Sequence, residues 1–519
     1  MLRSSMALTL ERFLAEADQF RLGDLLTERP HPKTRGLAEL ARTDLRRAIA
    51  AFAEVDRDAI AALRGHAGGI EELGRAAGEC LSAGGRVFLC GCGATGRLAI
   101  AVEYVWRATH PGAADRVVGF MAGGDAALVR SVEGFEDHAD FGARHLDDLG
   151  FTPADLVVGV TEGGETSYVI GAVEHAARLA ERRPWLLYCN PDELLRPIER
   201  SRRAIEDPRI RAFSMPVGPM ALTGSTRLQA ATALMLAVGL ALLGDGRDAE
   251  GALDRLLDHL AAADFGWLAG FIEAEADACR AGELVHYHAA RHAITVLADT
   301  TERAPTFNLR PFENRTEPRP LLSPCTLVVD GAGDGAAAWR ILLGRAPRPL
   351  GWPEHAQVTG AAWLAGFDFS AGAADRRASL AAGAAAGPHR FAISRERDRV
   401  ELALGDLRGG VPVRGRSLLE EQVLLKLALN LHSTLVMGRL DRYRDNVMTW
   451  VRPSNRKLID RAIRYTDALL RAGGEPVPGY AELARVCFAA LADLSEEESI
   501  VIKTADMVRA RTGHPPRPG

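Results

Sequence analysis

Residues 85–101, which read GRVFLCGCGATGRLAIA, constrain the fold of this chain more than any other stretch. The apolar run at 87–90 predicts a buried parallel strand. Glycines at positions 91, 93 and 96 then allow a tight turn, and helix-forming residues follow from position 97. A strand, a glycine turn and a helix N-terminus together form an anion site, because free N–H groups and the positive end of the helix dipole face the ligand.

Three interpretations of this turn are open from the residues alone. Phosphate binding is favoured by the helix N-terminus, where Thr95 adds a hydroxyl. A dinucleotide-binding turn is the second, because GCGATG fits G-x-G-x-x-G, but no acidic residue about 20 positions further on completes that pattern. A plain tight turn is the third. The order of the glycines excludes a nucleotide P-loop.

Strands and helices alternate over residues 85–245, which predicts a parallel sheet covered by helices on both faces. We expect strands at 87–90, 117–121, 156–160 and 185–189. A second α/β pattern begins near residue 280, with strands near 284–288, 325–330 and 390–394. The predicted domains are a helical segment at 1–80, a first lobe at 81–245, a second lobe at 246–416 and a helical region at 417–519.

Two further loops carry glycines and hydroxyls where strands end. Residues 161–167 read TEGGETS, and residues 223–227 read TGSTR. Hydroxyls at such places commonly cap helices. Three glycine-and-hydroxyl loops at the carboxyl edge of one sheet nevertheless favour a phosphate cradle, to which an arginine adds a bidentate donor.

Composition narrows the class of protein. The net charge of −5 argues against a nucleic-acid surface. The apolar run at 230–243 is too short to span a bilayer, and acidic residues in the N-terminal segment exclude a signal peptide. Seven scattered cysteines are typical of a reduced cytoplasmic protein. His286, His288 and His292 do not have a standard metal-ligand spacing, so no metal is expected.

Several segments resemble the SIS (sugar isomerase) superfamily, and within it the group formed by N-acetylmuramic acid 6-phosphate etherase and glucokinase regulatory protein. They are GCGATGRL at 91–98, AGGDAALVRSVEGFED at 122–137, VGPMALTGSTR at 217–227 and LALNLHSTLVMGRL at 427–440. The resemblance implies an α/β fold of two three-layer αβα lobes with parallel, flavodoxin-like sheets, the second lobe degenerate, plus helical N- and C-terminal segments. The layout is closer to the regulatory protein, because residues 228–416 separate two segments that adjoin in the etherases.

The resemblance also implies that the two lobes divide the site between them. Residues 299–306 match a family motif whose catalytic glutamate falls at Glu302, whereas the equivalent position in the first lobe is Val105. The second family glutamate matches Glu136. The second lobe has HAARHAI where the first has its glycine turn. We therefore expect an intramolecular pseudo-dimer, which could be monomeric, with one complete site. Its expected substrate-binding residues are Gly93, Ala94, Thr95, Gly96, Arg97, Thr161, Gly163, Glu165, Thr166, Ser225, Thr226, Arg227 and Lys426.

Two functions follow from this resemblance, and a third, another SIS isomerase-like role, is less favoured. One is the elimination of D-lactate from N-acetylmuramic acid 6-phosphate followed by hydration, with Glu136 as base, Glu302 as acid and no cofactor. The other is a non-catalytic, sugar-phosphate-responsive regulator of a sugar kinase.

The sequence departs from the family at Glu162 and Glu165, where relatives mostly have small or hydroxyl residues, and at Ala94, which replaces a hydroxyl.

Overall fold

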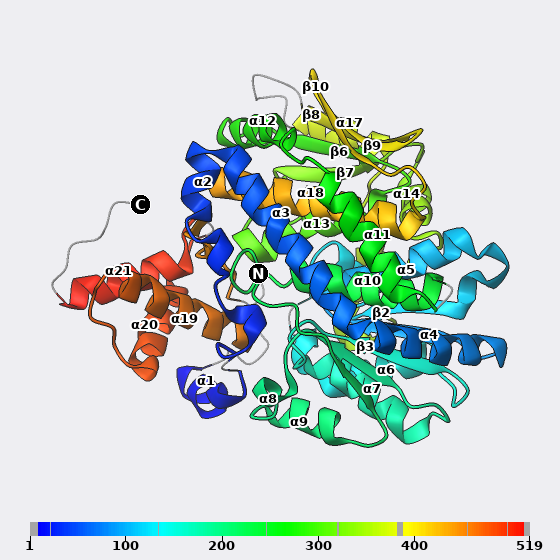
Figure 1. Cartoon of the computed structure of the whole chain (residues 1–519). Coiled ribbons are helices and arrows are strands. Elements are labelled where there is room, and N and C mark those ends of the chain that lie inside the picture. Colours follow the sequence, from blue (N-terminus) through cyan, green and yellow to red (C-terminus); the bar gives the residue numbers. More distant parts are fainter. Residues whose placement is uncertain are drawn as a thin grey trace.

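Two five-stranded sheets, one in each half of the chain, lie on opposite sides of a layer of helices in the computed structural model (Figure 1). The helices α5 (Ala94–Thr109), α10 (Gln229–Leu243), α13 (Ala293–Phe307) and α18 (Leu418–Arg439) pack together between the sheets. The structure describes residues 9–20, 22–132, 134–244, 247–318, 321–380, 388–453, 455–495 and 497–512.

The first sheet is entirely parallel, with the strand order β2-β1-β3-β4-β5. Its strands are β1 (Val87–Gly91), β2 (Val117–Met121), β3 (Leu156–Val160), β4 (Trp185–Tyr188) and β5 (Arg211–Ser214). The first four confirm the predicted strands, and β5 was not predicted. Alternate side chains of β1 pack into two different apolar clusters. Val87 and Leu89 belong to one cluster, and Phe88 and Cys90 belong to the other. Both faces are therefore covered, as the alternating sequence predicts.

Helices cover the two faces of this sheet. On one face lie α4 (Ala67–Ser82) and α5, which contact β1. On the other lie α6 (Ala139–Asp148) and α7 (Ser167–Leu179), and α7 contacts β1 and β3. The first lobe thus has the expected three-layer αβα architecture, with its ligand-binding edge at the carboxyl ends of the strands.

The second sheet has the order β10-β9-β8-β6-β7. The strands β6 (Val285–Ala289), β7 (Cys325–Val329) and β8 (His389–Glu396) are parallel, as expected. The expectation of a purely parallel sheet is wrong for the remainder, because β9 (Arg399–Leu404) and β10 (Leu407–Pro412) pair antiparallel. Their connections at 397–398 and 405–406 are too short for a crossover and permit only hairpins. At each turn one residue has a positive φ, Arg397 at 43° and Gly405 at 56°.

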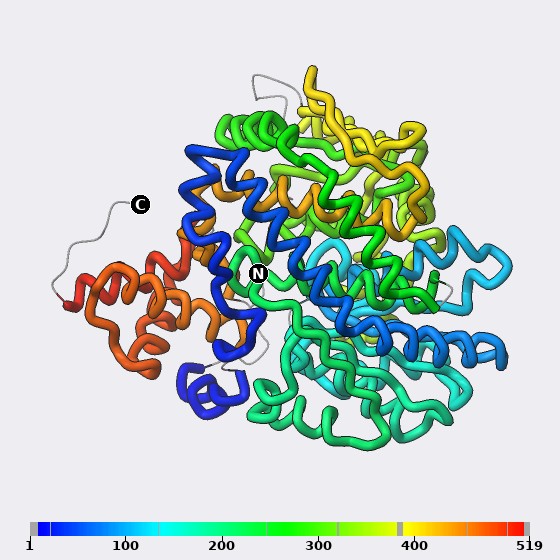
Figure 2. Tube along the Cα trace, in the orientation of Figure 1, coloured from blue at the N-terminus to red at the C-terminus, as the bar shows by residue number. Residues whose placement is uncertain are grey.

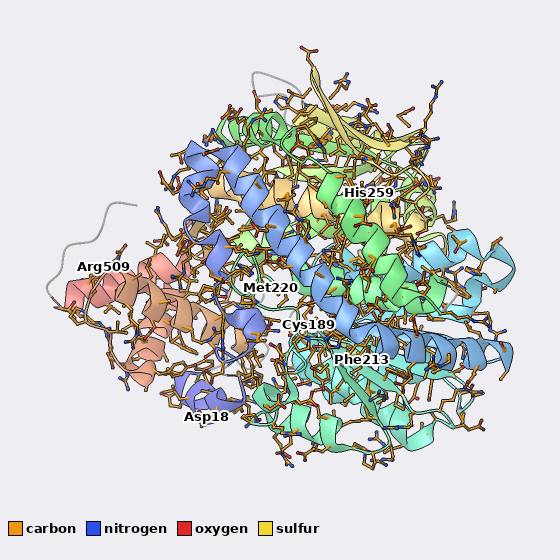
Figure 3. All side chains as sticks on the ribbon, viewed as in Figure 1. Asp18, Cys189, Phe213, Met220, His259 and Arg509 are labelled. Atoms are coloured by element: carbon orange, nitrogen blue, oxygen red, sulfur yellow. The ribbon has the colours of Figure 1, made fainter. Side chains whose placement is uncertain are left out.

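Helices from both ends of the chain complete the molecule. Near the N-terminus are α1 (Leu10–Glu16), α2 (Leu37–Thr43) and α3 (Leu45–Ala62). Near the C-terminus α19 (Arg456–Ala472), α20 (Tyr480–Ala492) and α21 (Ile500–Thr512) form a cluster at the side of the two lobes, where α1 contacts α20 (Figures 1 and 2). Arg509, whose guanidinium pairs with Glu475, lies in this cluster, away from the sheets (Figure 3).

A buried ion cluster joins the two lobes. Arg345 reaches from the second half of the chain to Glu103 on α5, with 3.0 Å between Nε and Oε1, and to Asp125, with 2.6 Å between Nη1 and Oδ2. Arg348 adds a contact of 2.7 Å to Glu103.

The lobe boundaries themselves stay a prediction. No helix in the described part of the chain is long and apolar enough to cross a membrane.

Candidate functional site

A cavity of about 180 Å³ lies where the first lobe, α13 and the start of α19 meet. Residues from both halves of the chain line it, and they include both predicted catalytic glutamates. Of the predicted site residues, the lining contains Gly93, Ala94, Glu136, Thr166, Ser225, Thr226, Arg227 and Glu302. The structure therefore brings Glu136, from the short 3-10 helix Phe135–Asp137, and Glu302, from α13, to one cavity beside the glycine turn.

The glycine turn places the N-terminus of α5 at this cavity. Gly93 precedes the helix with φ 54°, in the region that favours glycine. A Cβ atom on Gly91 would lie 2.4 Å from the backbone nitrogen of Gly96, so position 91 must also be glycine. The Thr95 hydroxyl accepts a hydrogen bond from the Cys92 N–H at 3.0 Å and donates one to the Cys92 carbonyl at 2.8 Å. Thr95 and Gly96 thus form part of the turn but do not line the cavity, whereas Ala94 lines it.

Arg97 is fully buried in the contact between the lobes. Its guanidinium donates to the Glu302 carboxylate, to the Thr301 hydroxyl at 3.2 Å and to the Ala127 carbonyl at 3.2 Å. Arg97 therefore orients Glu302 and does not itself line the cavity.

Arg227 lines the cavity, but its guanidinium is directed towards α13 and α18. It donates to Asp299 Oδ1 at 3.2 Å, to Asn430 Oδ1 at 3.2 Å and to the hydroxyls of Ser433 and Thr434. The Nε atom has no partner within the residues described. The other two guanidinium nitrogens of Arg227 thus connect the first lobe to α13 and α18.

Lys426 lies behind Arg227, on the wall of a smaller cavity of about 40 Å³. Its ammonium donates to the Arg227 carbonyl at 2.7 Å and to the Thr232 hydroxyl at 2.9 Å. Burial lowers the pKa of Lys426 to about 8. A direct contact between Lys426 and a ligand stays a prediction.

The loop after β3 is rigidly held. The Thr161 and Thr166 hydroxyls bond to one another at 2.9 Å, and Asn190 Nδ2 donates to the Gly163 carbonyl at 3.0 Å. Thr161 and Gly163 lie outside the cavity lining, whereas Glu162 lies on it. Burial raises the pKa of Glu162 to about 7, with Lys457 opposing the rise and Glu302 and Glu136 adding to it.

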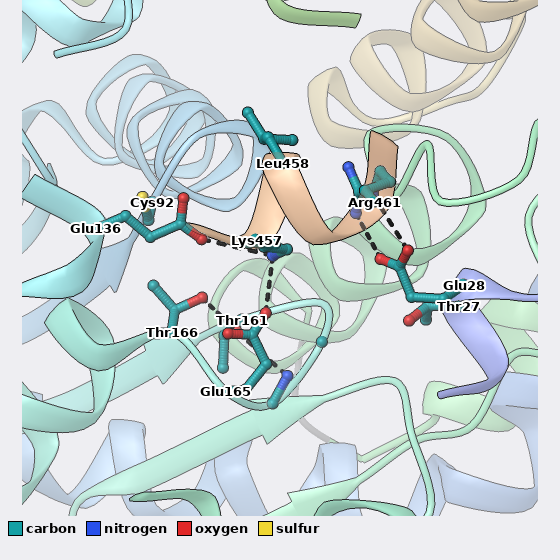
Figure 4. Close-up of polar contacts among 12 residues, drawn as sticks. Thr27, Glu28, Cys92, Glu136, Thr161, Glu165, Thr166, Lys457, Leu458 and Arg461 are labelled. Carbon is teal, nitrogen blue, oxygen red and sulfur yellow. Dashed lines mark hydrogen bonds and ion pairs between the residues drawn. The ribbon is translucent and has the colours of Figure 1, made fainter. Parts of the chain in front are cut away.

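Sequence reasoning missed the cation at the centre of the site, Lys457. Its ammonium lies 2.7 Å from Glu165 Oε1 and 3.4 Å from Glu136 Oε1. Figure 4 shows Lys457 between these two carboxylates. The carboxylate of Glu165 also pairs with Arg200 at 3.1 Å. Burial alone would raise the pKa of Glu165, but Lys457 and Arg200 hold it well below its usual value. Glu165 therefore positions Lys457 and does not line the cavity.

Burial also dominates the setting of Glu136 and raises its pKa, although Lys457 opposes this rise. Its second oxygen accepts a hydrogen bond from Asn455 Nδ2 at 3.2 Å. Close by, Arg461 pairs with Glu28 (Figure 4). A partly buried carboxylate with a raised pKa and an adjacent cation is suited to accepting a proton.

The three histidines considered as metal ligands have separate partners. His286 Nε2 accepts a hydrogen bond from Arg377 Nε at 3.4 Å, His288 contacts Asp330 at 3.0 Å, and His292 contacts Glu421 at 3.4 Å. Within the described ranges no group of three His, Cys, Asp or Glu side chains is arranged to hold a metal ion.

Comparison with known proteins yields relatives of two kinds. The family model for the glucokinase regulatory protein N-terminal SIS domain matches residues 72–177. The N-acetylmuramic acid 6-phosphate etherase of Serratia proteamaculans is 35% identical over 223 residues, which cover 43% of this chain and 70% of that protein. The corresponding protein of Yersinia pestis (strain Pestoides F) is 34% identical over 43% of this chain and 71% of its own length.

Solved structures also align with the chain. The tagatose-6-phosphate ketose/aldose isomerase of Escherichia coli aligns with a TM-score of 0.39 and 13% identity over 77% of this chain and 96% of its own. A phosphosugar isomerase described as putative, from Clostridium difficile, aligns with a TM-score of 0.42 and 11% identity over 77% of this chain and 94% of its own. The identity and coverage of the curated relatives show that this chain belongs to the SIS superfamily, in the group of N-acetylmuramic acid 6-phosphate etherases and glucokinase regulatory protein.

Proposed function

We propose that this protein is a phosphosugar-binding lyase that eliminates D-lactate from N-acetylmuramic acid 6-phosphate and then hydrates the product to N-acetylglucosamine 6-phosphate. The observation that carries this proposal is the meeting of Glu136 and Glu302, from opposite halves of the chain, at one cavity beside the N-terminus of α5. The names of the curated relatives support the same activity.

The chemistry requires a base and an acid. With the sugar open, the C1 aldehyde makes the proton on C2 acidic, and Glu136 removes it. The C3–O bond then breaks, and Glu302 gives a proton to the departing lactate oxygen. Water adds to C3 of the unsaturated sugar, and a proton returns to C2. Each positioned proton transfer contributes about 10²–10⁴-fold to the rate.

The protein's other groups bind and orient the substrate. The phosphate fits the N-terminus of α5, where the dipole favours an anion, with the hydroxyls of Ser225 and Thr226 beside it. Lys457 holds Glu136 in place and supplies positive charge near the developing C2 carbanion. None of these steps calls for a metal or an organic cofactor.

The test is the release of D-lactate from N-acetylmuramic acid 6-phosphate by the purified full chain. Glu302→Gln and Glu136→Gln should each lower the rate at least about 100-fold while ligand-induced thermal stabilisation persists. Binding without lactate release by the wild-type chain would contradict the proposal.

A second candidate is a sugar-phosphate-responsive regulator of a sugar kinase. It is favoured by the match of residues 72–177 to the regulatory-protein domain and by the presence of two unequal sheets in one chain. This candidate predicts ligand-induced stabilisation without lactate release, together with a change in the activity of a sugar kinase when the protein is added.

A further inference from the structure

Glu162 is a buried carboxyl group that the proposed elimination does not use. It lies on the cavity wall with 8% of its surface exposed. Its Oε1 atom has no hydrogen-bond partner among the residues that the structure describes. The loop that carries it is fixed, because the Glu162 carbonyl accepts the Cys189 N–H at 3.0 Å and the next residue's carbonyl accepts the Asn190 amide. The carboxyl group is therefore held at the cavity by its backbone.

The other charged groups on the cavity wall each have an ionic partner. Glu136 has Lys457, Glu302 has Arg97, Arg227 has Asp299 and Arg461 has Glu28. Over the described ranges, Glu162 is the one charged group of this lining for which no ion pair is found. The Glu162 carboxyl group accepts a hydrogen bond from its own backbone N–H, which lowers its pKa, but its Oε1 atom stays unsatisfied. A buried carboxylate oxygen without a donor is costly, so a bound molecule that supplies one at this position gains affinity.

The two threonines of this loop are bonded to one another. One hydrogen bond of 2.9 Å joins the Thr161 and Thr166 hydroxyls, and the Thr161 hydroxyl also accepts the Gly164 N–H at 3.3 Å. An anion placed here would meet the Glu162 carboxylate, which repels it. The loop is thus unsuited to the phosphate end of a ligand and suited to a neutral hydrogen-bond donor.

We propose that Glu162 is a specificity-determining residue that accepts a hydrogen bond from a hydroxyl or amide N–H of the bound phosphosugar and confines the phosphate to the N-terminus of α5. This inference rests on the proposed function only in that the cavity takes a phosphosugar. The raised pKa of Glu162, about 7 because of burial, gives the contact a pH signature. A donor from the ligand stabilises the ionised form, so the contact strengthens as pH rises through 7.

The experiment measures dissociation constants for N-acetylglucosamine 6-phosphate and for inorganic phosphate by calorimetry. Glu162→Met removes the acceptor and should weaken sugar-phosphate binding about 10–100-fold, as expected for a hydrogen bond to a charged group. Glu162→Gln keeps an acceptor oxygen and should give a smaller loss. Both variants should bind inorganic phosphate at least as tightly as wild type, because the repulsion is gone. Glu193→Gln, at an exposed position of helix α8 (Asp192–Leu195), is the matched control.

A pH series supplies an independent readout. Between pH 6 and 8 wild-type affinity should rise more than that of Glu162→Gln, whose profile reports the ligand's own phosphate ionisation near about pH 6. Equal sugar-phosphate affinities for wild type and both Glu162 variants, each folded by its melting profile, would overturn the inference and leave the proposed function standing. If the wild-type chain binds no phosphosugar, the proposed function and this inference both fail.

Discussion

The carboxylate of Glu302, on α13 in the second half of the chain, accepts a hydrogen bond from the guanidinium of Arg97, on α5 in the first half. Arg97 is 2% exposed and belongs to the helix that begins at the glycine turn. The candidate acid is therefore positioned by the lobe that carries the proposed phosphate site. The side chain of Arg97 thus connects the proposed phosphate-binding lobe to the proposed catalytic acid.

Replacing Arg97 with methionine should both destabilise the protein and impair lactate release. The substitution leaves the Glu302 carboxylate in the lobe contact without its partner, and such losses cost about 3–5 kcal/mol. Urea unfolding and the lactate assay measure the two effects. Arg64→Met, which removes an exposed ion pair with Asp254, should change stability by less than about 1 kcal/mol. A similar cost for both variants would argue against a special role for Arg97.

Ser225 should bind phosphate without contributing to stability. Its hydroxyl is buried on the cavity wall and has no partner among the described residues, so Ser225→Ala removes no internal hydrogen bond. We expect phosphosugar affinity to fall about 10-fold or more, with an unchanged melting temperature. Thr223→Val is the comparison, because the Thr223 hydroxyl is equally unpartnered but lies off the cavity. Equal affinities for these two variants would contradict the assignment.

Lys457→Met should make the protein more sensitive to acid. Glu165 has a pKa held below its unfolded value, so it contributes stability that is complete above about pH 4.5 and is lost as pH falls through its folded pKa. Without Lys457 the depression shrinks, and acid unfolding should begin at a higher pH. Circular dichroism from pH 7 to 2 measures this. Lys33→Met, at an exposed pair with Glu54, should leave the acid midpoint unchanged.

Glu162 and Asp56 should show the opposite pH dependence of stability. Burial raises the pKa of each to about 7. A carboxyl whose folded pKa exceeds its unfolded pKa stabilises the fold most below the unfolded value and loses that advantage as pH rises towards 7. Glu162→Gln and Asp56→Asn should therefore raise the melting temperature more at pH 8 than at pH 5, by the equivalent of about 2–3 kcal/mol each. A gain independent of pH would show that ionisation is not the cause.

The Arg345 cluster should behave as a coupled unit. Arg345→Leu leaves Glu103 and Asp125 buried with fewer cations and should cost about 3–5 kcal/mol. Adding Asp125→Asn to that variant should recover part of the loss, because one unpaired charge disappears. A double-mutant cycle by chemical unfolding gives the coupling energy. Strict additivity of the two substitutions would contradict the cluster.

The sequence predicted the parts of the site that depend on local patterns. The glycine turn at 91–96 and the strands β1 to β4 follow from apolar runs and turn residues. Glu136 and Glu302 were predicted only through the resemblance to the SIS family. The strands β9 and β10 were missed because their charged, half-exposed residues resemble surface loops. Their antiparallel pairing follows from two-residue turns that no apolar pattern reveals.

Lys457 was missed for a different reason. Both of its carboxylate partners are distant in sequence, Glu165 by 292 residues and Glu136 by 321. Lys426 was predicted because it lies within an apolar helix, yet its ammonium donates to the Arg227 carbonyl, just before α10, and to the Thr232 hydroxyl on α10. The sequence did contain an indication, because Lys457 lies in the first turn of α19 and Arg461 follows one turn later on the same helix. Only the fold shows that these two residues face the cavity.

The contact between α5 and α13 forms within a single polypeptide. Its assembly is a first-order event, so dilution cannot separate the two halves of the site as it separates the subunits of a dimer. Each half can also change its sequence independently, because a substitution at Val105 or in the HAARHAI segment occurs only once in the molecule. In a symmetric dimer the same substitution would occur in both subunits. Co-expressing a chain that lacks Glu136 with one that lacks Glu302 would therefore restore no function by subunit exchange.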